Sequence, residues 1–263
     1  MRKHFWWINC VVLILVMSII GWTPVRATKN TETLKTAHVT TAKELFSRYV
    51  NTVYQTAHLQ ETGMDLGVFQ KALTGYFNIK SANNLAKNSS VITVVDFSKS
   101  SREKRMWIID LLNNQLLLNT WVAHGQGSGN DMATSFSDTN ESHQSSLGFY
   151  LADDVYFGKH GRSLRLDGLD QGFNANARSR GVVVHAADYV GAGTIAAIGR
   201  LGRSFGCPAV SPAVIDQVIN TIKGKSVFFI NGNSSDYTSK YLNDTVFANF
   251  TAQDSTMIEA PRS

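Results

Sequence analysis

One cysteine and one histidine in the second half of the chain have the types and spacing that nucleophilic catalysis requires. Cys207 stands in the stretch GRSFGCPAV, and His185 follows three valines 22 residues earlier. A free thiol near pKa 8.5 is only slightly ionised at neutral pH, so a reactive cysteine needs a base or a positive charge beside it. An imidazole can be that base, and Arg200 and Arg203 are close enough in sequence to favour the thiolate. The pattern predicts a Cys207 nucleophile activated by His185.

Other interpretations of these residues are open on sequence alone. A cysteine without particular context is usually a small buried hydrophobe, but Gly206 before Cys207 leaves room for the close approach of a backbone or a substrate. His124 in AHGQGSG and His160 in KHGRS are further candidates for the base. The chain has no HExxH motif, no paired cysteine ligands and no tight cluster of histidines and carboxylates, so we expect no metal site.

The N-terminus predicts export. A basic start precedes an apolar run over residues 5–22, and Val25 and Ala27 suit the −3 and −1 positions of a cleavage site. The run is also long enough to act as an uncleaved membrane anchor. Removing residues 1–27 lowers the number of basic residues from 25 to 22 against 20 acidic ones, so we expect no nucleic-acid partner. It also removes Cys10, which leaves Cys207 without a disulfide partner.

Helices are predicted on both sides of a region of strands. After a polar segment over residues 28–40, a capping box precedes an amphipathic stretch, a second helix is expected over LGVFQKALTGYF (66–77), and a third near the end. The aromatic side chains of the first two helices are expected to pack in a core. The residues expected to cap these helices are Thr41 with Glu44 for the first, and Ser211, Pro212 and Gly224 for the third.

Apolar and β-branched runs from residue 90 onward predict at least six strands, and hence a mostly-β domain after a helical segment. Asn113-Asn114 interrupts one run as the turn of a hairpin, since asparagine accepts a positive φ. Residues 125–146 lack periodicity, and loops of that length are usually functional or disordered, so we expect a wall or lid of the site. The expected strands lie within 90–98, the two halves of 105–125, 147–153, 162–169, 181–189 and 225–232.

The order of the candidate residues resembles a known enzyme family. His185, a spacer of 18 residues and Ser204-Phe205-Gly206-Cys207 are similar to the signature of the L,D-transpeptidase (YkuD-type) catalytic domain, which has histidine, a spacer and Ser/Thr-His-Gly-Cys. With GKHGRSLRLDGLDQGFNANARSRGVVVHAADYV, IGRLGRSFGCPAV, WVAHGQGSG and SSLGFYL, the chain resembles the exported murein L,D-transpeptidases over roughly residues 40–232. The resemblance implies a β-sandwich or barrel-like fold, α+β overall. Its implied parts are a signal peptide (1–27), a helical region (28–88), a catalytic domain (89–232) and a polar C-terminal segment (233–263).

The resemblance implies cysteine acyl transfer on peptidoglycan stem peptides, without a cofactor, in the bacterial periplasm or cell envelope. Cys207 would attack the carbonyl of the L-centre at stem position three and expel the terminal D-alanine. His185, oriented by the backbone carbonyl of Ala186, would move the proton, and Asp188 is not needed as a third member. The remaining residues implied are Gly206, which with Cys207 would offer backbone N–H groups to the oxyanion, and Ser204, Arg203 and Phe205, which would contact the substrate.

Two positions depart from the family pattern, and several outcomes of the reaction stay open. Phe205 stands where the wider family has histidine, and Ala209 stands near its usual polar residue, so Arg203, Arg200 or the 125–146 loop would supply those contacts. The acyl-enzyme could pass to a second stem (a 3→3 cross-link), to water (an L,D-carboxypeptidase) or to a protein lysine. A catalytically inactive wall-binding domain is the alternative from another class. Sortases and NlpC/P60-type peptidases fit less well, because their spacing or order of cysteine and histidine differs.

Overall fold

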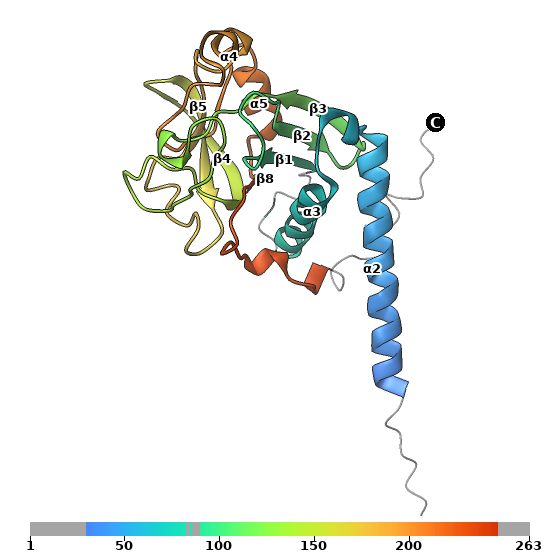
Figure 1. Cartoon of the computed structure of the whole chain (residues 1–263). Coiled ribbons are helices and arrows are strands. Elements are labelled where there is room, and N and C mark those ends of the chain that lie inside the picture. The colour runs from blue at the N-terminus through green and yellow to red at the C-terminus, as the bar shows by residue number, and fades with distance from the viewer. Residues whose placement is uncertain (1–29, 83–84, 86–89, 247–263) are drawn as a thin grey trace, which may run out of the picture. The chain divides into compact units, whose positions relative to one another are not determined.

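The computed structural model describes residues 30–82, 85 and 90–246, with side chains from Ala42 onward (Figure 1). The predicted signal segment, residues 1–27, lies outside this range. Within the described residues, no helix is both long and apolar enough to cross a membrane. The chain divides between Thr41 and Ala42 into two compact units, and the first is described only as the opening part of one helix.

Helices and strands follow one another along the chain in this order: α2 (Asn30–Thr56), η1 (Gln60–Thr62), α3 (Leu66–Ser81), β1 (Val91–Asp96), β2 (Met106–Asp110), β3 (Gln115–Thr120), η2 (Gln126–Ser128), β4 (Gly148–Gly158), β5 (Gly161–Gly168), β6 (Val183–Ala186), α4 (Ala192–Ile198), β7 (Ala209–Val210), α5 (Ile215–Ile222), β8 (Ser226–Asn231) and η3 (Lys240–Leu242).

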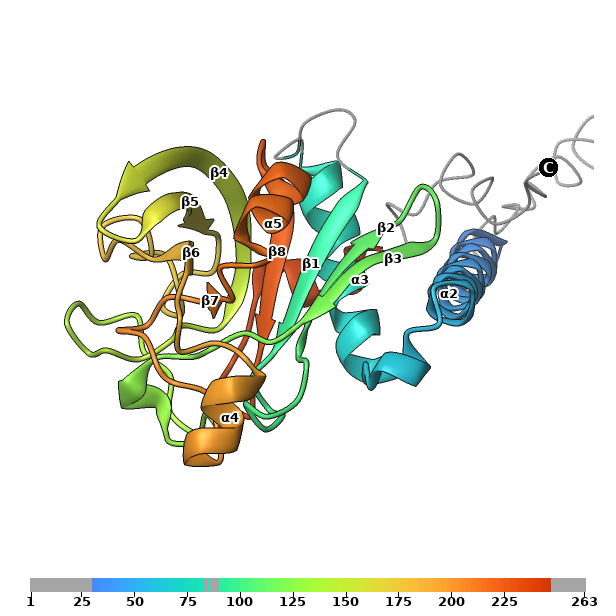
Figure 2. The same cartoon turned by 90° about the horizontal axis from the view of Figure 1, so that it is seen from above.

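Eight strands form one sheet in the order β3-β2-β1-β8-β4-β5-β6-β7. Neighbouring strands are antiparallel except for two parallel pairs, β1 with β8 and β6 with β7. A register shift between Ala152 and Val155 marks a bulge in β4, and bulges bend strands. Figure 2 shows β4 curving over its length, so that β5 and β6 turn out of the plane of β1 and β8. The mostly-β, barrel-like architecture with helices ahead of it is confirmed.

Strand β8 shows why its sequence is apolar without interruption. Val227 and Phe229 belong to a core cluster with α3 and the later part of α2, whereas Phe228 and Ile230 belong to a second cluster with α5. Because successive side chains point to opposite faces, a strand covered on both faces reads as a continuous apolar run. The expected core role of the aromatic residues in α2 and α3 is confirmed, since Tyr49 packs edge-on against Phe77 and both are buried.

The expected hairpin between β2 and β3 is confirmed. Asn114 has a φ of 49°, and the Asp110 carboxylate accepts hydrogen bonds from the backbone N–H groups of Leu112 at 2.9 Å and Asn113 at 3.3 Å. All expected strand regions contain a strand. Strand β7, only two residues long, has no counterpart in the sequence pattern, because its existence depends on its partners rather than on its own residues.

Two predicted helix starts are wrong. The first helix begins at Asn30, not at Thr41, because residues 28–40 contain neither glycine nor proline and so nothing stops the helix from extending backward. The last helix begins at Ile215, after a turn in which the carbonyl of Ser211 accepts from the N–H of Val214 at 3.1 Å. Serine followed by proline favours such turns as well as helix starts, and here the turn prevails.

Candidate active site

The segment that carries Cys207 is held between two pieces of backbone. On one side, β7 pairs in parallel with β6, so that His185 lies beside Ala209, and the His185 N–H donates to the Pro208 carbonyl at 3.4 Å. On the other side, the Ala123 N–H donates to the Ala209 carbonyl at 2.8 Å. The structure therefore brings Cys207, two residues before this short strand, to the edge of the strand that carries His185.

Cys207 is a free, partly exposed thiol whose Sγ donates to the carbonyl of Gly181 at 3.6 Å. Burial of the sulfur raises the pKa of Cys207 above its ordinary value, and the Val183 N–H and the charges of Arg180 and Lys159 offset this only in part. The resting group is therefore a thiol at neutral pH. The two arginines predicted to favour the thiolate, Arg200 and Arg203, are not among these charges.

His185 is buried, and its hydrogen bond fixes its tautomer. Nδ1 lies 2.8 Å from the carbonyl oxygen of Ala186. A carbonyl only accepts, so Nδ1 carries the proton, and in the neutral ring Nε2 is left as the proton acceptor. Burial lowers the pKa of His185, and the neighbouring His160 and Lys159 lower it further. The ring is neutral at neutral pH and can act as a base, in the orientation expected from Ala186.

The other two candidate bases have different surroundings. His160, in the turn between β4 and β5, stacks on the ring of His185 with centroids 4.2 Å apart. His124 is fully buried, and its Nδ1 accepts from the Arg105 guanidinium at 2.8 Å. Burial and the charge of Arg105 lower the pKa of His124 to about 4. Its Nε2 lies 3.4 Å from the carbonyl oxygen of Gly129, so both ring nitrogens of His124 are engaged, whereas Nε2 of His185 is left as an acceptor.

The turn before Cys207 is closed by the Ser204 hydroxyl. It donates to the Cys207 carbonyl at 2.6 Å and accepts from the Gly206 N–H at 3.1 Å. Among the hydrogen bonds of the described residues, none uses the backbone N–H of Cys207. Gly206 has a φ of 122°, and a Cβ there would lie 2.7 Å from the carbonyl oxygen of Gln144. The expected close approach of a backbone at Gly206 is thus present, and that backbone belongs to the 125–146 loop.

The 125–146 loop forms one side of this region. The Ser145 hydroxyl donates to the Gly206 carbonyl at 3.0 Å and accepts from the Gly125 N–H at the same distance. Arg203 donates to the carbonyl of Gly129 at 2.9 Å and to Asn130 Oδ1 at 3.1 Å, so it holds the loop.

Phe205, which occupies the position of the family histidine, is 64% exposed. Its ring stacks on His143 from the 125–146 loop, with centroids 4.5 Å apart. An aromatic surface two residues from Cys207 is therefore open to solvent.

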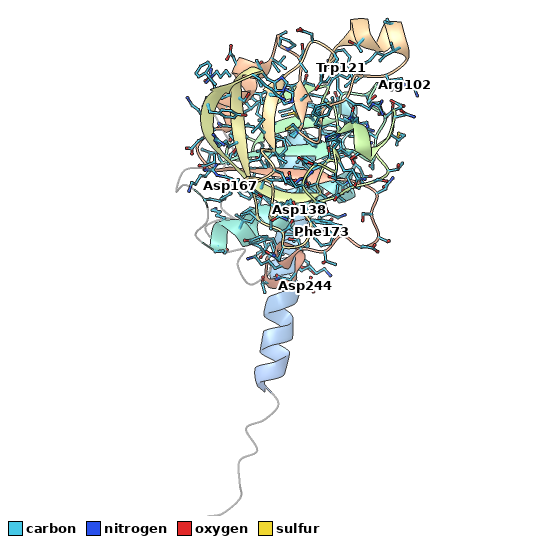
Figure 3. All side chains as sticks on the ribbon, turned by 90° about the vertical axis from the view of Figure 1, so that its left-hand side faces the viewer. Arg102, Trp121, Asp138, Asp167, Phe173 and Asp244 are labelled. Atoms are coloured by element: carbon cyan, nitrogen blue, oxygen red, sulfur yellow. The ribbon has the colours of Figure 1, made fainter. Side chains whose placement is uncertain are left out.

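A small apolar cluster packs against the segment that carries Cys207. Ala123, Leu201 and Ala209 are fully buried in it, and Trp121 packs against it at the edge. Trp121 Nε1 also donates to the carbonyl of Arg102 at 3.0 Å, and both residues are labelled in Figure 3. The alanines suit this position because small side chains let β6, β7 and residues 123–125 approach closely.

Sequence reasoning missed three residues near the thiol. Arg180 and Lys159 supply the positive charge at Cys207, and burial together with Cys207 raises the pKa of Tyr189 to about 12. Arg180 ends the run ARSR just before the valines that lead to His185, which is the one sequence signal that could have drawn attention to it. A surface hollow of about 390 Å³ lies next to the residues that follow His185, and neither His185 nor Cys207 lines it. Its lining residues are Lys159, His160, Ala186, Ala187, Asp188, Tyr189 and Pro212.

No group of three or more histidine, cysteine, aspartate or glutamate side chains within residues 30–82, 85 and 90–246 could hold a metal ion. The arrangement offers three components: a thiol, a neutral imidazole of fixed tautomer, and the backbone N–H of Cys207, which makes no hydrogen bond with the described residues. These are the components of acyl transfer by a cysteine nucleophile.

Comparisons with known proteins identify the family of the chain. No curated protein matches the chain. Solved L,D-transpeptidases resemble it weakly: that of Mycobacterium smegmatis has 12% identity and a TM-score of 0.34 over 54% of this chain and 58% of that one. That of Stackebrandtia nassauensis has 15% identity and a TM-score of 0.33 over 65% and 68%. The chain thus spans less than two thirds of the Mycobacterium smegmatis structure.

A family model, the L,D-transpeptidase catalytic domain, matches residues 60–231, well over half of the sequence. The chain belongs to the L,D-transpeptidase catalytic domain family.

Proposed function

We propose that this protein is a cysteine acyl transferase acting on peptidoglycan stem peptides, which cleaves the L,D bond before the terminal D-alanine and forms 3→3 cross-links. Family membership supports the reaction class. The single observation that carries the assignment of residues is the hydrogen bond from His185 Nδ1 to the Ala186 carbonyl, on a strand paired with the segment that follows Cys207. It leaves Nε2 as the acceptor for a thiol proton.

The proposed first half-reaction moves one proton and exchanges one bond. His185 Nε2 takes the proton of the Cys207 thiol while Sγ attacks the carbonyl carbon of the L-centre at stem position three. The carbonyl oxygen becomes negative and is held by the backbone N–H of Cys207. When the carbonyl re-forms, the C–N bond to D-alanine breaks, and the leaving amine receives the proton from Nε2. The product is a thioester on Cys207 and free D-alanine.

The second half-reaction determines the product. An amine from another stem attacks the thioester, passes its proton through His185 Nε2 to the departing thiolate, and restores the free enzyme with a 3→3 link. Water in place of the amine gives a tripeptide, and the enzyme is then an L,D-carboxypeptidase. We propose that either acceptor approaches from the hollow lined by Lys159, His160 and Ala186, since His160 stacks on the ring of His185.

Incubation of the full-length protein with tetrapeptide muropeptides, followed by mass spectrometry, tests this function. We expect release of D-alanine and appearance of 3→3 dimers. Tripeptides alone would establish the carboxypeptidase, and no product from a folded protein would favour a wall-binding domain without activity. Cys207→Ala should abolish every product, while the thermal unfolding midpoint stays close to that of the wild type. Retained turnover in that variant would exclude Cys207 as the nucleophile.

We also propose that the protein works outside the cytoplasm of a bacterium, because its substrate is there and because residues 1–27 have the pattern of an export signal. Mass determination of the protein isolated from the cell envelope tests this. Loss of about the first 27 residues would indicate cleavage, and an intact N-terminus in the membrane fraction would indicate an anchor.

A further inference from the structure

Arg180 is a buried cation that joins the 125–146 loop to the Cys207 turn. Its side chain is 4% exposed. The guanidinium donates to the carbonyls of Ser137 at 2.7 Å and Gln144 at 2.8 Å. It also donates to the hydroxyl of Ser142 at 3.2 Å and to the hydroxyl of Ser146. One guanidinium therefore fixes four points of a ten-residue stretch, which only a planar fork with five N–H donors can do.

The same guanidinium lies next to the turn of the nucleophile. A Cβ on Gly206 would be 3.5 Å from the Arg180 Nη2 atom and 2.7 Å from the Gln144 carbonyl oxygen that Nη2 binds. The carboxylate that compensates its charge lies at the other terminal nitrogen: Asp138 Oδ1 is 3.7 Å from Nη1 and makes no hydrogen bond. Asp138 is labelled in Figure 3. Arg180 and Asp138 thus form a buried ion pair without a direct hydrogen bond, in a setting where screening is weak.

We propose that Arg180 is a positioning residue of the active site: it fastens residues 137–146 against Gly206 and provides the fixed positive charge that stabilises the Cys207 thiolate during attack. The inference rests on the proposed function in so far as Cys207 is the nucleophile. The backbone position of Arg180 suits this role, because it lies three residues before the start of β6, the strand that carries His185. One residue thereby links the loop wall, the nucleophile and the strand of the base.

Other groups that face Cys207 must be kept constant in a test. Lys159 on the β4–β5 turn and Tyr189 after β6 interact with the thiol, His160 stacks on His185, and His143 stacks on Phe205, two residues before Cys207. Lys159, which also lowers the pKa of the thiol, is exposed, so its contribution is screened by solvent and salt. A buried charge and an exposed charge can therefore be separated by ionic strength.

The test is the rate of Cys207 alkylation by iodoacetamide as a function of pH, measured on the full-length protein without peptidoglycan. The midpoint of this profile reports the pKa of the thiol. Arg180→Met, which keeps much of the volume but removes the charge, should raise the midpoint by about one unit, insensitively to salt. In Arg180→Lys the alkylation midpoint should lie close to that of the wild type, because the positive charge is kept. Turnover of muropeptides should still be lost, because an ammonium cannot make the four loop contacts at once. The matched control is Arg178→Met: Arg178 pairs at the surface with Asp153, Asp154 and Asp167, and we expect its removal to leave the midpoint unchanged.

The outcomes separate this inference from the proposed function. Equal midpoints in wild type and Arg180→Met would overturn the role of the charge, and full turnover in Arg180→Lys would overturn the role of the clamp. If the Arg180 variants do not fold, Asp138→Asn decides: it removes the carboxylate that offsets Arg180, so the midpoint should fall, and an unchanged or higher midpoint would refute the inference. If the alkylation midpoints of wild type and variants differ as expected but the wild-type protein forms no product from muropeptides, the proposed function alone is refuted.

Discussion

At the scale of residues, burial decides the resting charges of the two central side chains. It raises the pKa of the Cys207 thiol and lowers the pKa of the His185 imidazole. Both shifts favour the neutral forms, so the resting pair is a thiol and an imidazole rather than a thiolate and an imidazolium. The proton then moves during attack. Alkylation of Cys207 should be slow until the pH approaches the pKa of its thiol.

These directions predict the pH dependence of turnover. The imidazole must be neutral to accept the proton, and its pKa is lowered, so kcat/KM should rise with pH through a value below the ordinary 6.5 of histidine and then reach a plateau. Ionisation of the thiol should appear only above the ordinary thiol value, because that pKa is raised. Initial rates on a tetrapeptide between pH 4 and about pH 10 measure both limits. Alkylation that is already maximal below pH 6 would contradict this, since it would show a preformed thiolate.

His160 provides a second prediction about the same ring. It covers His185, and both burial and His160 itself lower the pKa of that imidazole. His160→Ala should therefore let water reach the ring and move the acid limit of kcat/KM to higher pH. His160→Phe should keep the stack and the shielding, and with them most of the turnover at neutral pH. Profiles of the two variants side by side make the check; identical profiles would mean that the stack does not influence the base.

How far sequence determines the site differs from residue to residue. Cys207 and His185 are indicated by residue types and spacing that are local in sequence, and the carbonyl of Ala186 by the resemblance to the family. Arg180 and Lys159 do not, because their nearness to the thiol depends on how the turn before β6 and the tip of the β4–β5 hairpin fold back. Arg203 donates to Gly129 and Asn130, which its sequence neighbourhood did not indicate, and its contact with the substrate stays a prediction.

At the scale of elements, the Cys207 turn depends on a glycine. At a φ of 122° an L side chain is strained, and a Cβ on Gly206 would also meet the Gln144 carbonyl. Gly206→Ala should lower kcat/KM at least about a hundredfold and the unfolding free energy by about 1–3 kcal/mol, because both the turn and the loop against it must shift. Gly172→Ala is the matched control, since Gly172 has a φ of 81° but nothing within 4 Å. Thermal unfolding and turnover of both variants check this, and equal effects would show that the contact with the loop is unimportant.

Elements were predictable where their own residues decide them. The hydrophobic runs located every longer strand, because burial on both faces of a sheet leaves a strong signature. Helix starts were less predictable: Thr41 and Glu44 form a capping pattern inside a helix that nothing upstream stops, and Ser211-Pro212 opens a turn. Strand β7 was not predictable, since two residues become a strand only by lying between β6 and residues 123–125.

At the scale of the whole molecule, the polar segment after β8 is tied to the sheet by one buried carboxylate. Asp170 accepts from the Phe149 N–H at 2.8 Å, from the Tyr237 hydroxyl at 2.8 Å and from the Ser239 hydroxyl at 2.6 Å. Phe173, labelled in Figure 3, packs edge-on against Tyr237. Composition alone gave residues 233–263 no expected structure, because the contacts of the described part, up to residue 246, are made with distant residues.

Asp170 should therefore control the attachment of this segment. In Asp170→Asn an amide NH₂ replaces one of two carboxylate oxygens, so a hydroxyl of Tyr237 or Ser239 must turn from donating to accepting, or the Phe149 N–H loses its acceptor. The free energy of unfolding should therefore fall by about 1–3 kcal/mol, although the amide escapes the cost of burying a charge. Burial raises the pKa of Asp170, so its own contribution to stability is present at low pH and is lost as the pH rises through that raised value. The loss of unfolding free energy in the variant should consequently be larger near pH 4 than at pH 7.

Ser239→Ala, which removes one donor and leaves the carboxylate, is the milder control. Urea unfolding at the two pH values measures the difference, and a variant as stable as the wild type at both would mean that the segment is held by other contacts.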